Sequence, residues 1–150
     1  MQDVCDAGSS RCTRSGSPEG KPNSMIAANN STSSTRTLVS SDGYSLPADT
    51  TPPKGAGEGF RPHELLEAAL ASCTAITLRL VAEARGIPLR YVKVTIDLDR
   101  ADPAKSVFRT QIEFDDQVTE SDRKTLMAAA RLCPVRKTLS KPIAFDEIIA

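Results

Sequence analysis

The residues best suited to covalent chemistry in this chain are two cysteines, Cys73 and Cys133, which stand 60 positions apart. A thiolate attacks electrophiles, and a second thiol that meets it lets the pair cycle through a disulfide. Zinc binding is poorly supported, because the chain has one histidine and no Cys-x-x-Cys motif. We therefore predict no metal and no cofactor. The alternative is that both cysteines are inert, Cys73 as a small residue on a buried helix face and Cys133 as an ordinary helix end.

A long helix is predicted to position Cys73. Pro62 suits the first position of a helix, and Gly86 followed by Pro88 supplies a stop. These limits enclose about 24 residues, or roughly 36 Å of helix. Apolar and small residues recur along it at spacings of three and four, and we expect them to form one face: Leu65, Leu66, Ala69, Leu70, Cys73, Ile76, Thr77 and Leu80.

Strands are predicted on both sides of this helix. Asp42-Gly43 favours a tight turn between two short strands, and residues 50–60, with paired prolines and three glycines, predict an irregular loop. Apolar and polar residues alternate over 92–98 and over 108–114, so these segments are expected to pair antiparallel.

The C-terminal third should contain two helices and a strand. Thr119, with Asp122 three positions later, predicts a capped helix that ends at Cys133-Pro134, and VRKTL after Pro134 predicts a short one. Apolar residues from Ile143 to Ile149 predict a last strand. The predicted class is α+β, a mainly antiparallel sheet around a long central helix. Such a sheet leaves the other helix face uncovered, which favours a homodimer.

Composition limits the classes of partner. Nineteen basic residues balance nineteen acidic ones, which disfavours binding to nucleic acid or to an anionic membrane surface. No apolar run reaches the length of a spanning helix, and no signal peptide is evident, so we expect a soluble, cytoplasmic protein. Residues 1–35, rich in serine and poor in large apolar residues, predict a disordered tail before one domain over 36–150. Cys5 and Cys12 lie in that tail and are assigned no role.

Two stretches resemble the signature regions of the OsmC/Ohr family of thiol peroxidases, in its general OsmC-like branch. PHELLEAALASCTAITLRLVAEARGIPL is similar to the family's pattern around its first cysteine, and CPVRKTL to its CPVHKTL. VSSDGYSLPADTTPP and the glycine-containing loop after it are similar to the strand and loop upstream. The likeness covers residues 36 to 150.

The resemblance implies an intertwined homodimer with active sites at the subunit interface, acting as an antioxidant enzyme of the stress response. Cys73 would be the peroxidatic cysteine, which attacks the O–O bond of an organic hydroperoxide, and Cys133 the resolving one, which forms the disulfide. A small dithiol such as dihydrolipoamide would restore the thiols. The alternative is a non-peroxidatic OsmC-like protein, either another thiol oxidoreductase or a small-molecule-binding dimer.

One position departs from the family. Peroxidase branches carry a glutamate ten positions before the cysteine, where it holds an activating arginine; here that position is His63, with Glu64 beside it. Arg36 is the best-placed arginine before the first hairpin, and Arg61 and Arg79 are other candidate cations. Ten helical residues span about 15 Å, so neither His63 nor Glu64 can touch Cys73 on the same straight helix. If they share a site with Cys73, a second chain is expected to bring one of them. Otherwise Glu64 is an acidic residue favoured by the helix dipole, and His63 a surface residue.

Overall fold

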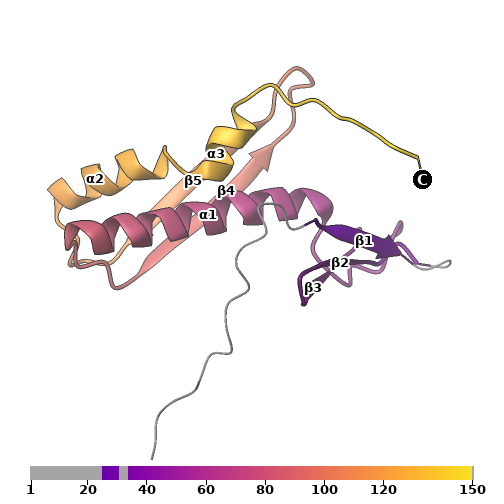
Figure 1. Ribbon diagram of the computed structural model, residues 1–150, viewed down its shortest axis with the longest axis horizontal. Helices are drawn as coiled ribbons and strands as arrows, with labels where there is room; N and C mark the ends of the chain where they lie inside the picture. The colour runs from indigo at the N-terminus through magenta and orange to yellow at the C-terminus, as the bar shows by residue number, and fades with distance from the viewer. Residues whose placement is uncertain (1–24, 31–33, 150) are drawn as a thin grey trace, which may run out of the picture.

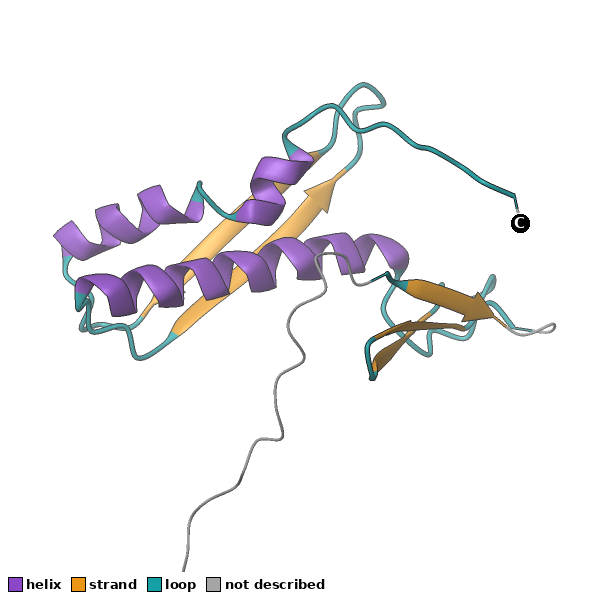
Figure 2. Ribbon diagram, in the orientation of Figure 1, coloured by secondary structure: helices purple, strands orange, loops and turns teal. Residues whose placement is uncertain are grey.

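The described part of the chain folds into three helices and five strands, and its α+β class is the predicted one (Figures 1 and 2). A computed structural model describes residues 25–30 and 34–149. The elements are β1 (Ala27–Asn30), β2 (Thr37–Ser41), β3 (Tyr44–Ala48), α1 (Pro62–Arg85), β4 (Val92–Asp99), β5 (Val107–Phe114), α2 (Glu120–Ala130) and α3 (Pro134–Leu139). The strands form two separate antiparallel sheets, β1-β2-β3 and β4-β5, rather than the single sheet expected.

Helix α1 has the predicted limits, and it packs against β4, α2 and α3 (Figure 1). Pro62 occupies its first turn, the Glu64 side chain accepts a 2.8 Å hydrogen bond from the backbone N–H of Arg61, and Gly86 ends the helix at a φ of 66°. A carboxylate satisfies a free N–H at the start, and glycine adopts the left-handed conformation at the end without strain.

The apolar face predicted for α1 is only partly the buried one. The buried stripe is Leu70, Thr74, Leu78 and Ala82, whereas Ile76 and Leu80 are 59% and 60% exposed. Helical periodicity finds apolar stripes but does not say which of them the chain itself covers. By length and composition alone α1 is apolar enough to cross a membrane, which corrects the expectation that no segment reaches that length. The core helix of a soluble protein passes the same test.

The β4-β5 hairpin supplies one apolar and one polar face, as its alternation predicts. Val94 pairs with Ile112 on the face that packs against the core, and Lys93 pairs with Glu113 on the other, where their charged groups are 3.3 Å apart. The capped helix α2 closes the core, with the Thr119 hydroxyl accepting from the Asp122 N–H at 3.2 Å. The buried cluster is Leu78, Ala82, Leu89, Val118, Leu126, Ala129 and Ala130.

The β1-β2-β3 sheet lies beyond the N-terminal end of α1, apart from the second sheet and the other helices (Figure 1). The predicted hairpin is confirmed, with Asp42 and Gly43 at positive φ in its turn. Strand β1 corrects the predicted tail, because residues 27–30 pair with β2 although all four are exposed. The amino-acid composition reports how much apolar side-chain surface a segment can bury. Strand β1 is stabilised instead by backbone hydrogen bonds to β2, which composition does not predict. Within that tail, residues 1–24 and 31–33 lie outside the described residues.

A buried carboxylate organises the predicted loop after β3. Asp49, 3% exposed, accepts hydrogen bonds from the Thr35 hydroxyl at 2.6 Å and from the backbone N–H groups of Thr50, Ala56 and Glu58 at 2.7, 3.2 and 3.1 Å. Chiefly the Thr35 bond, with these N–H groups, lowers the pKa of Asp49 to about 2. Gly55 is required here, because a Cβ on it would lie 2.6 Å from the carboxylate.

The last predicted strand is wrong for this chain. Residues 141–149 contain no strand, and Ile143, Phe145, Ile148 and Ile149 are all more than half exposed. The segment runs away from α3 in extended form (Figure 1). Apolar residues can suggest a strand, but a strand needs a neighbouring edge to pair with, and none lies beside this segment in the described chain.

Candidate active site at the paired cysteines

The fold brings Cys73 and Cys133 together, although they are far apart in the sequence. Cys73 lies midway along α1, and Cys133 is the N-cap residue of α3, which packs on α1. Both are free thiols, and they lie close enough for each to influence the pKa of the other. Cys133 is fully buried, while Cys73 is partly exposed.

The first turn of α3 is directed at both sulfurs. Pro134 starts this helix without an N–H of its own, and the free N–H groups of the next residues need acceptors. The Val135 N–H faces both cysteine sulfurs, and the Arg136 N–H faces Cys133. The CPVR segment thus positions Cys133 and supplies two hydrogen-bond donors to the pair.

The two thiols differ in acidity. Burial raises the pKa of Cys73, outweighing the Val135 N–H and the Thr77 hydroxyl, which favour its thiolate. Burial also acts to raise the pKa of Cys133, but the Arg136 N–H, the Cys73 thiol and the Thr74 hydroxyl together outweigh it, so the pKa of Cys133 is lowered. Within one chain, therefore, the two pKa values shift in opposite directions, that of Cys73 upward and that of Cys133 downward.

Two threonines beside the cysteines were missed from the sequence. Thr77 donates to the Cys73 carbonyl oxygen at 2.8 Å and also reaches its sulfur. Thr74 is 2% exposed, and its hydroxyl is among the groups that lower the pKa of Cys133. A signal was present, since Thr74 is a polar residue at helical spacing between Leu70 and Leu78.

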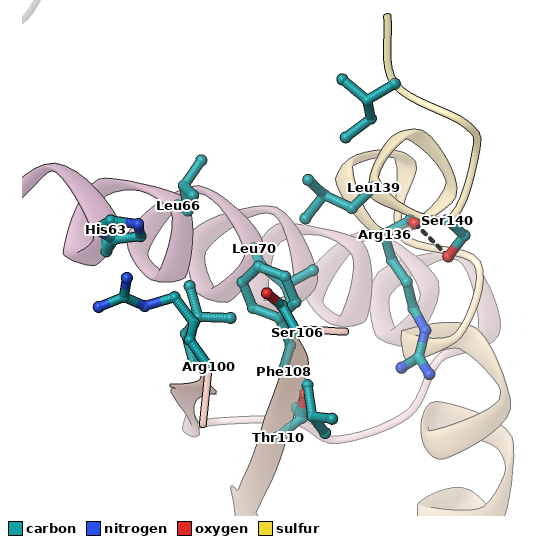
Figure 3. Close-up of a pocket in the computed structure, with 13 residues that line it drawn as sticks. His63, Leu66, Leu70, Arg100, Ser106, Phe108, Thr110, Arg136, Leu139 and Ser140 are labelled. Atoms are coloured by element: carbon teal, nitrogen blue, oxygen red, sulfur yellow. Dashed lines mark hydrogen bonds between the residues drawn. The ribbon is translucent and has the colours of Figure 1, made fainter. Parts of the chain in front are cut away.

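Two cavities lie between α1, β5 and α3, the smaller one also bordered by α2, and neither cysteine is among their lining residues. The larger, of about 590 Å³, has His63 and Arg100 at one end and Arg136 and Leu139 at the other (Figure 3). The smaller, of about 290 Å³, reaches Thr74. Four residues line both: Leu70, Phe108, Thr110 and Arg136. Their linings combine apolar side chains with arginines and contain no aspartate or glutamate.

The structure does not bring the predicted supporting residues to Cys73 within one chain. Arg36 forms an ion pair with Glu58, with Nε and Oε2 3.6 Å apart, and Glu64 binds Arg61 at 2.6 Å. His63 lines the larger cavity instead.

The remaining candidate cation, Arg79, binds backbone carbonyls after α1, those of Leu89 and Arg90. None of the groups that set the pKa of Cys73 is a cation. Among the described residues, no group of three or more His, Cys, Asp or Glu side chains is arranged to hold a metal ion.

Comparison with known proteins places this arrangement in one family. The profile of a family described as OsmC-like protein matches residues 55–147. A solved OsmC-like protein from Mycoplasma pneumoniae is 22% identical, with a TM-score of 0.67 over 78% of this chain and 86% of that one. The organic hydroperoxide resistance protein OhrB of Bacillus subtilis is 20% identical, with a TM-score of 0.58 over 79% and 90% of the two chains. No curated protein matches this sequence.

Proposed function

Since this chain belongs to the OsmC-like protein family, we propose that it is a thiol-dependent peroxidase that reduces organic hydroperoxides with Cys73 and Cys133. One observation carries the proposal: the packing of α3 on α1 brings two free thiols from distant segments close enough for each to influence the pKa of the other. The larger cavity, lined mostly by apolar side chains such as Leu66, Leu70 and Phe108, suits a substrate with an organic group. Solved structures with this fold include proteins described as organic hydroperoxide resistance proteins.

The reaction divides between the two sulfurs. The Cys73 thiolate attacks the terminal peroxide oxygen, the O–O bond breaks, and the organic oxygen leaves as an alcohol after taking a proton. Cys73 becomes a sulfenic acid. The Cys133 thiolate then attacks the Cys73 sulfur, the S–S bond forms, and the S–O bond breaks to give water. An external dithiol reduces the disulfide by exchange.

The first step needs a group that one chain does not provide. Because the pKa of Cys73 is raised by burial, its thiolate requires a nearby cation. We infer a homodimer in which a second copy brings Arg36, His63 and Glu64 close to Cys73. The Arg36–Glu58 ion pair offers a carboxylate that can hold this arginine where the family glutamate is replaced by His63.

The exposed side of α1 supports the same dimer. Leu66, Ile76 and Leu80 are between 44% and 60% exposed on this helix, and apolar surface of that kind normally marks an interface. The β1-β2-β3 sheet has no apolar core of its own, so it too gains from a second chain. In the proposed dimer α1 lies at the centre.

A second candidate function is favoured by the replacement of the family glutamate by His63. Glu64 is engaged by Arg61, and the pKa of Cys73 is raised. These features favour a thiol oxidoreductase or small-molecule-binding dimer that does not use hydroperoxides. The two candidates differ in whether Cys73 reacts with a hydroperoxide faster than an ordinary thiol does.

The test uses Cys5→Ser/Cys12→Ser protein, in which Cys73 and Cys133 are the only cysteines. On adding cumene or tert-butyl hydroperoxide, we expect both thiols to be lost much faster than from free cysteine, with mass spectrometry showing the disulfide. Cys73→Ser should abolish consumption, because a hydroxyl gives no thiolate at neutral pH. Cys133→Ser should allow one turnover and then overoxidation of Cys73. Thiol loss no faster than that of free cysteine would reject the peroxidase and favour the second candidate.

A further inference from the structure

The Arg36–Glu58 ion pair is weak by itself. Its charged atoms are 3.6 Å apart, and its side chains are 53% and 61% exposed. Exposed pairs of this kind contribute little to stability, because two long side chains must be ordered in water and salt screens their attraction. Another part of the fold is therefore needed to keep Arg36 and Glu58 side by side.

The buried Asp49 carboxylate connects the two segments that carry this pair. The hydroxyl of Thr35, the residue directly before Arg36, donates to Asp49 Oδ1 at 2.6 Å. The backbone N–H of Glu58 donates to Asp49 Oδ2 at 3.1 Å. Each oxygen of one carboxylate thus holds one of the two segments, and hydrogen bonds to an ionised group are the stronger ones.

Both segments are also fixed on their other side. Thr37, directly after Arg36, belongs to the β2-β3 ladder. Phe60, two positions after Glu58, accepts a 3.0 Å hydrogen bond at its carbonyl from the Asp49 N–H. The backbone on both sides of each charged residue is therefore held in place, which limits where the two side chains can reach.

We propose that Asp49 is a positioning residue for the peroxidase reaction: through the Thr35 hydroxyl and the Glu58 N–H it sets the place of the Arg36 guanidinium, which a second copy of the chain presents to Cys73. This rests on the proposed function and its dimer. A guanidinium beside a thiol stabilises the thiolate, and the stabilisation weakens as their separation grows. An arginine on a loosely held backbone would therefore activate Cys73 less.

The charges around this arrangement are well defined. Arg36 faces Glu58, and the four donors to Asp49 are uncharged, namely one hydroxyl and three backbone N–H groups. These four bonds, that of the hydroxyl most of all, lower the pKa of Asp49 to about 2, so it stays a carboxylate wherever a thiol titrates. Burial raises the pKa of Cys73, and within the described part of one chain Cys133 is the titratable group that adds to this effect.

The test removes one donor to Asp49 and leaves the other three in place. Thr35→Val loses the hydroxyl, and Thr35→Ser keeps it. Thr37→Val is the matched control, because Thr37 also adjoins Arg36 but donates to the Thr35 carbonyl oxygen at 3.2 Å. With hydroperoxide at neutral pH, Cys73 of Thr35→Val should react about tenfold more slowly, as expected for a lost hydrogen bond to a charged group. The pH profile of the rate should move to higher pH, and Thr35→Ser should stay near the wild-type profile.

A double-mutant cycle tests whether the hydroxyl acts through Arg36. Arg36→Gln should slow the reaction at least as much as Thr35→Val does, and combining the two should slow it no further. Additive losses would mean that Thr35→Val only damages the fold, and they would overturn the proposal.

Mixed dimers test whether the arginine comes from the second copy. When Cys73→Ser and Thr35→Val chains are coexpressed, one site of the mixed dimer combines an intact Cys73 with a correctly held Arg36. That site should react at the wild-type rate. A rate equal to that of the Thr35→Val homodimer would contradict the shared site.

A further measurement needs no hydroperoxide. In Cys5→Ser/Cys12→Ser/Cys133→Ser protein, Cys73 is the only cysteine, and its rate of alkylation by iodoacetamide against pH reports its thiolate. Thr35→Val should move this profile to higher pH. Wild-type protein without peroxidase activity would reject the proposed function alone, because alkylation still tests the role of Asp49. An unchanged alkylation profile in Thr35→Val, or an equal shift in Thr37→Val, would overturn that role.

Discussion

The two ends of α1 join regions that are stabilised by different means. On its N-terminal side, residues 34–60 bury only Ala48 and Asp49, and backbone pairing and the Asp49 hydrogen bonds hold the segment in shape. On the other side, β4, β5 and α2 enclose an apolar cluster with the C-terminal half of α1. Hydrogen bonds can define the shape of a sheet without giving it a core, whereas the second region has a core that one chain completes.

The thiol pair belongs to the second region, and this has a physical reason. Disulfide chemistry requires two sulfurs held in a narrow range of distance and direction. A packed interior provides that constraint, because neighbouring side chains leave little room for alternative arrangements. Residues 34–60 contain the exposed Arg36–Glu58 ion pair instead. This region can therefore place a charged side chain next to a second chain.

The largest expected effect is loss of the second region's core. Leu126 is fully buried on α2, and replacing it with alanine should lower the free energy of unfolding by about 2–5 kcal/mol, since a cavity remains. Leu132→Ala is the control, because that side chain is 60% exposed after the helix. Urea denaturation measures both. Equal, small losses in the two variants would mean that this cluster is not the stabilising core.

A charged residue on the exposed apolar side of α1, formed by Leu66, Ile76 and Leu80, tests whether a second chain packs against this helix. Ile76→Glu should raise the dissociation constant of the dimer at least about 100-fold, because an unpaired carboxylate would be buried at the interface. Sedimentation and the concentration dependence of the unfolding midpoint report the change. Ala128→Glu, on the exposed side of α2, serves as a control. A wild-type protein that sediments as a monomer with full peroxidase activity would contradict the shared site.

The sequence was most informative where local signals coincide. Pro62 and Gly86 marked α1, Thr119 marked α2, and the alternation around Val94 and Ile112 marked β4-β5, so these elements were predicted with nearly correct limits. The final strand was predicted but is absent, and β1 is present but was not predicted, for one shared reason. Strand formation depends on whether an edge is available for pairing, and neither composition nor periodicity contains that information.

The candidate site divides in the same way. Cys73 and Cys133 were identified by type and by family resemblance, and the structure places them side by side. The acidity order of the pair was not predictable, because it depends on N–H groups of α3 and on Thr74, which the fold brings to Cys133. The ion-pair partners of Arg36 and Glu64 were not predictable either. The fold places Glu58 beside Arg36 and Arg61 beside Glu64, and each pair forms an ion pair.

A smaller effect is expected from the Asp49 hydrogen bonds that order the first region. Asp49→Asn should lower the melting temperature at neutral pH, because an amide NH₂ cannot accept the N–H bonds of both Ala56 and Glu58. The pKa of Asp49 is depressed to about 2, so its stabilisation is complete above about pH 4 and is lost as pH falls through about 2. The difference in melting temperature between wild type and variant should therefore shrink over that range. Asp116→Asn, on the surface, should show no such trend.

The smallest effect concerns the outer face of β4-β5, which should stay in water in both the chain and the dimer. Lys93 and Glu113 form an ion pair there, with side chains 54% and 46% exposed. Exposed pairs contribute at most about 1 kcal/mol, and salt screens them further. A double-mutant cycle with Lys93→Gln and Glu113→Gln should therefore give a coupling free energy below that limit, decreasing as salt is added. A coupling of several kcal/mol that salt does not reduce would show that this face is desolvated in the assembly, and the proposed interface would then have to include the outer face of the hairpin as well as α1.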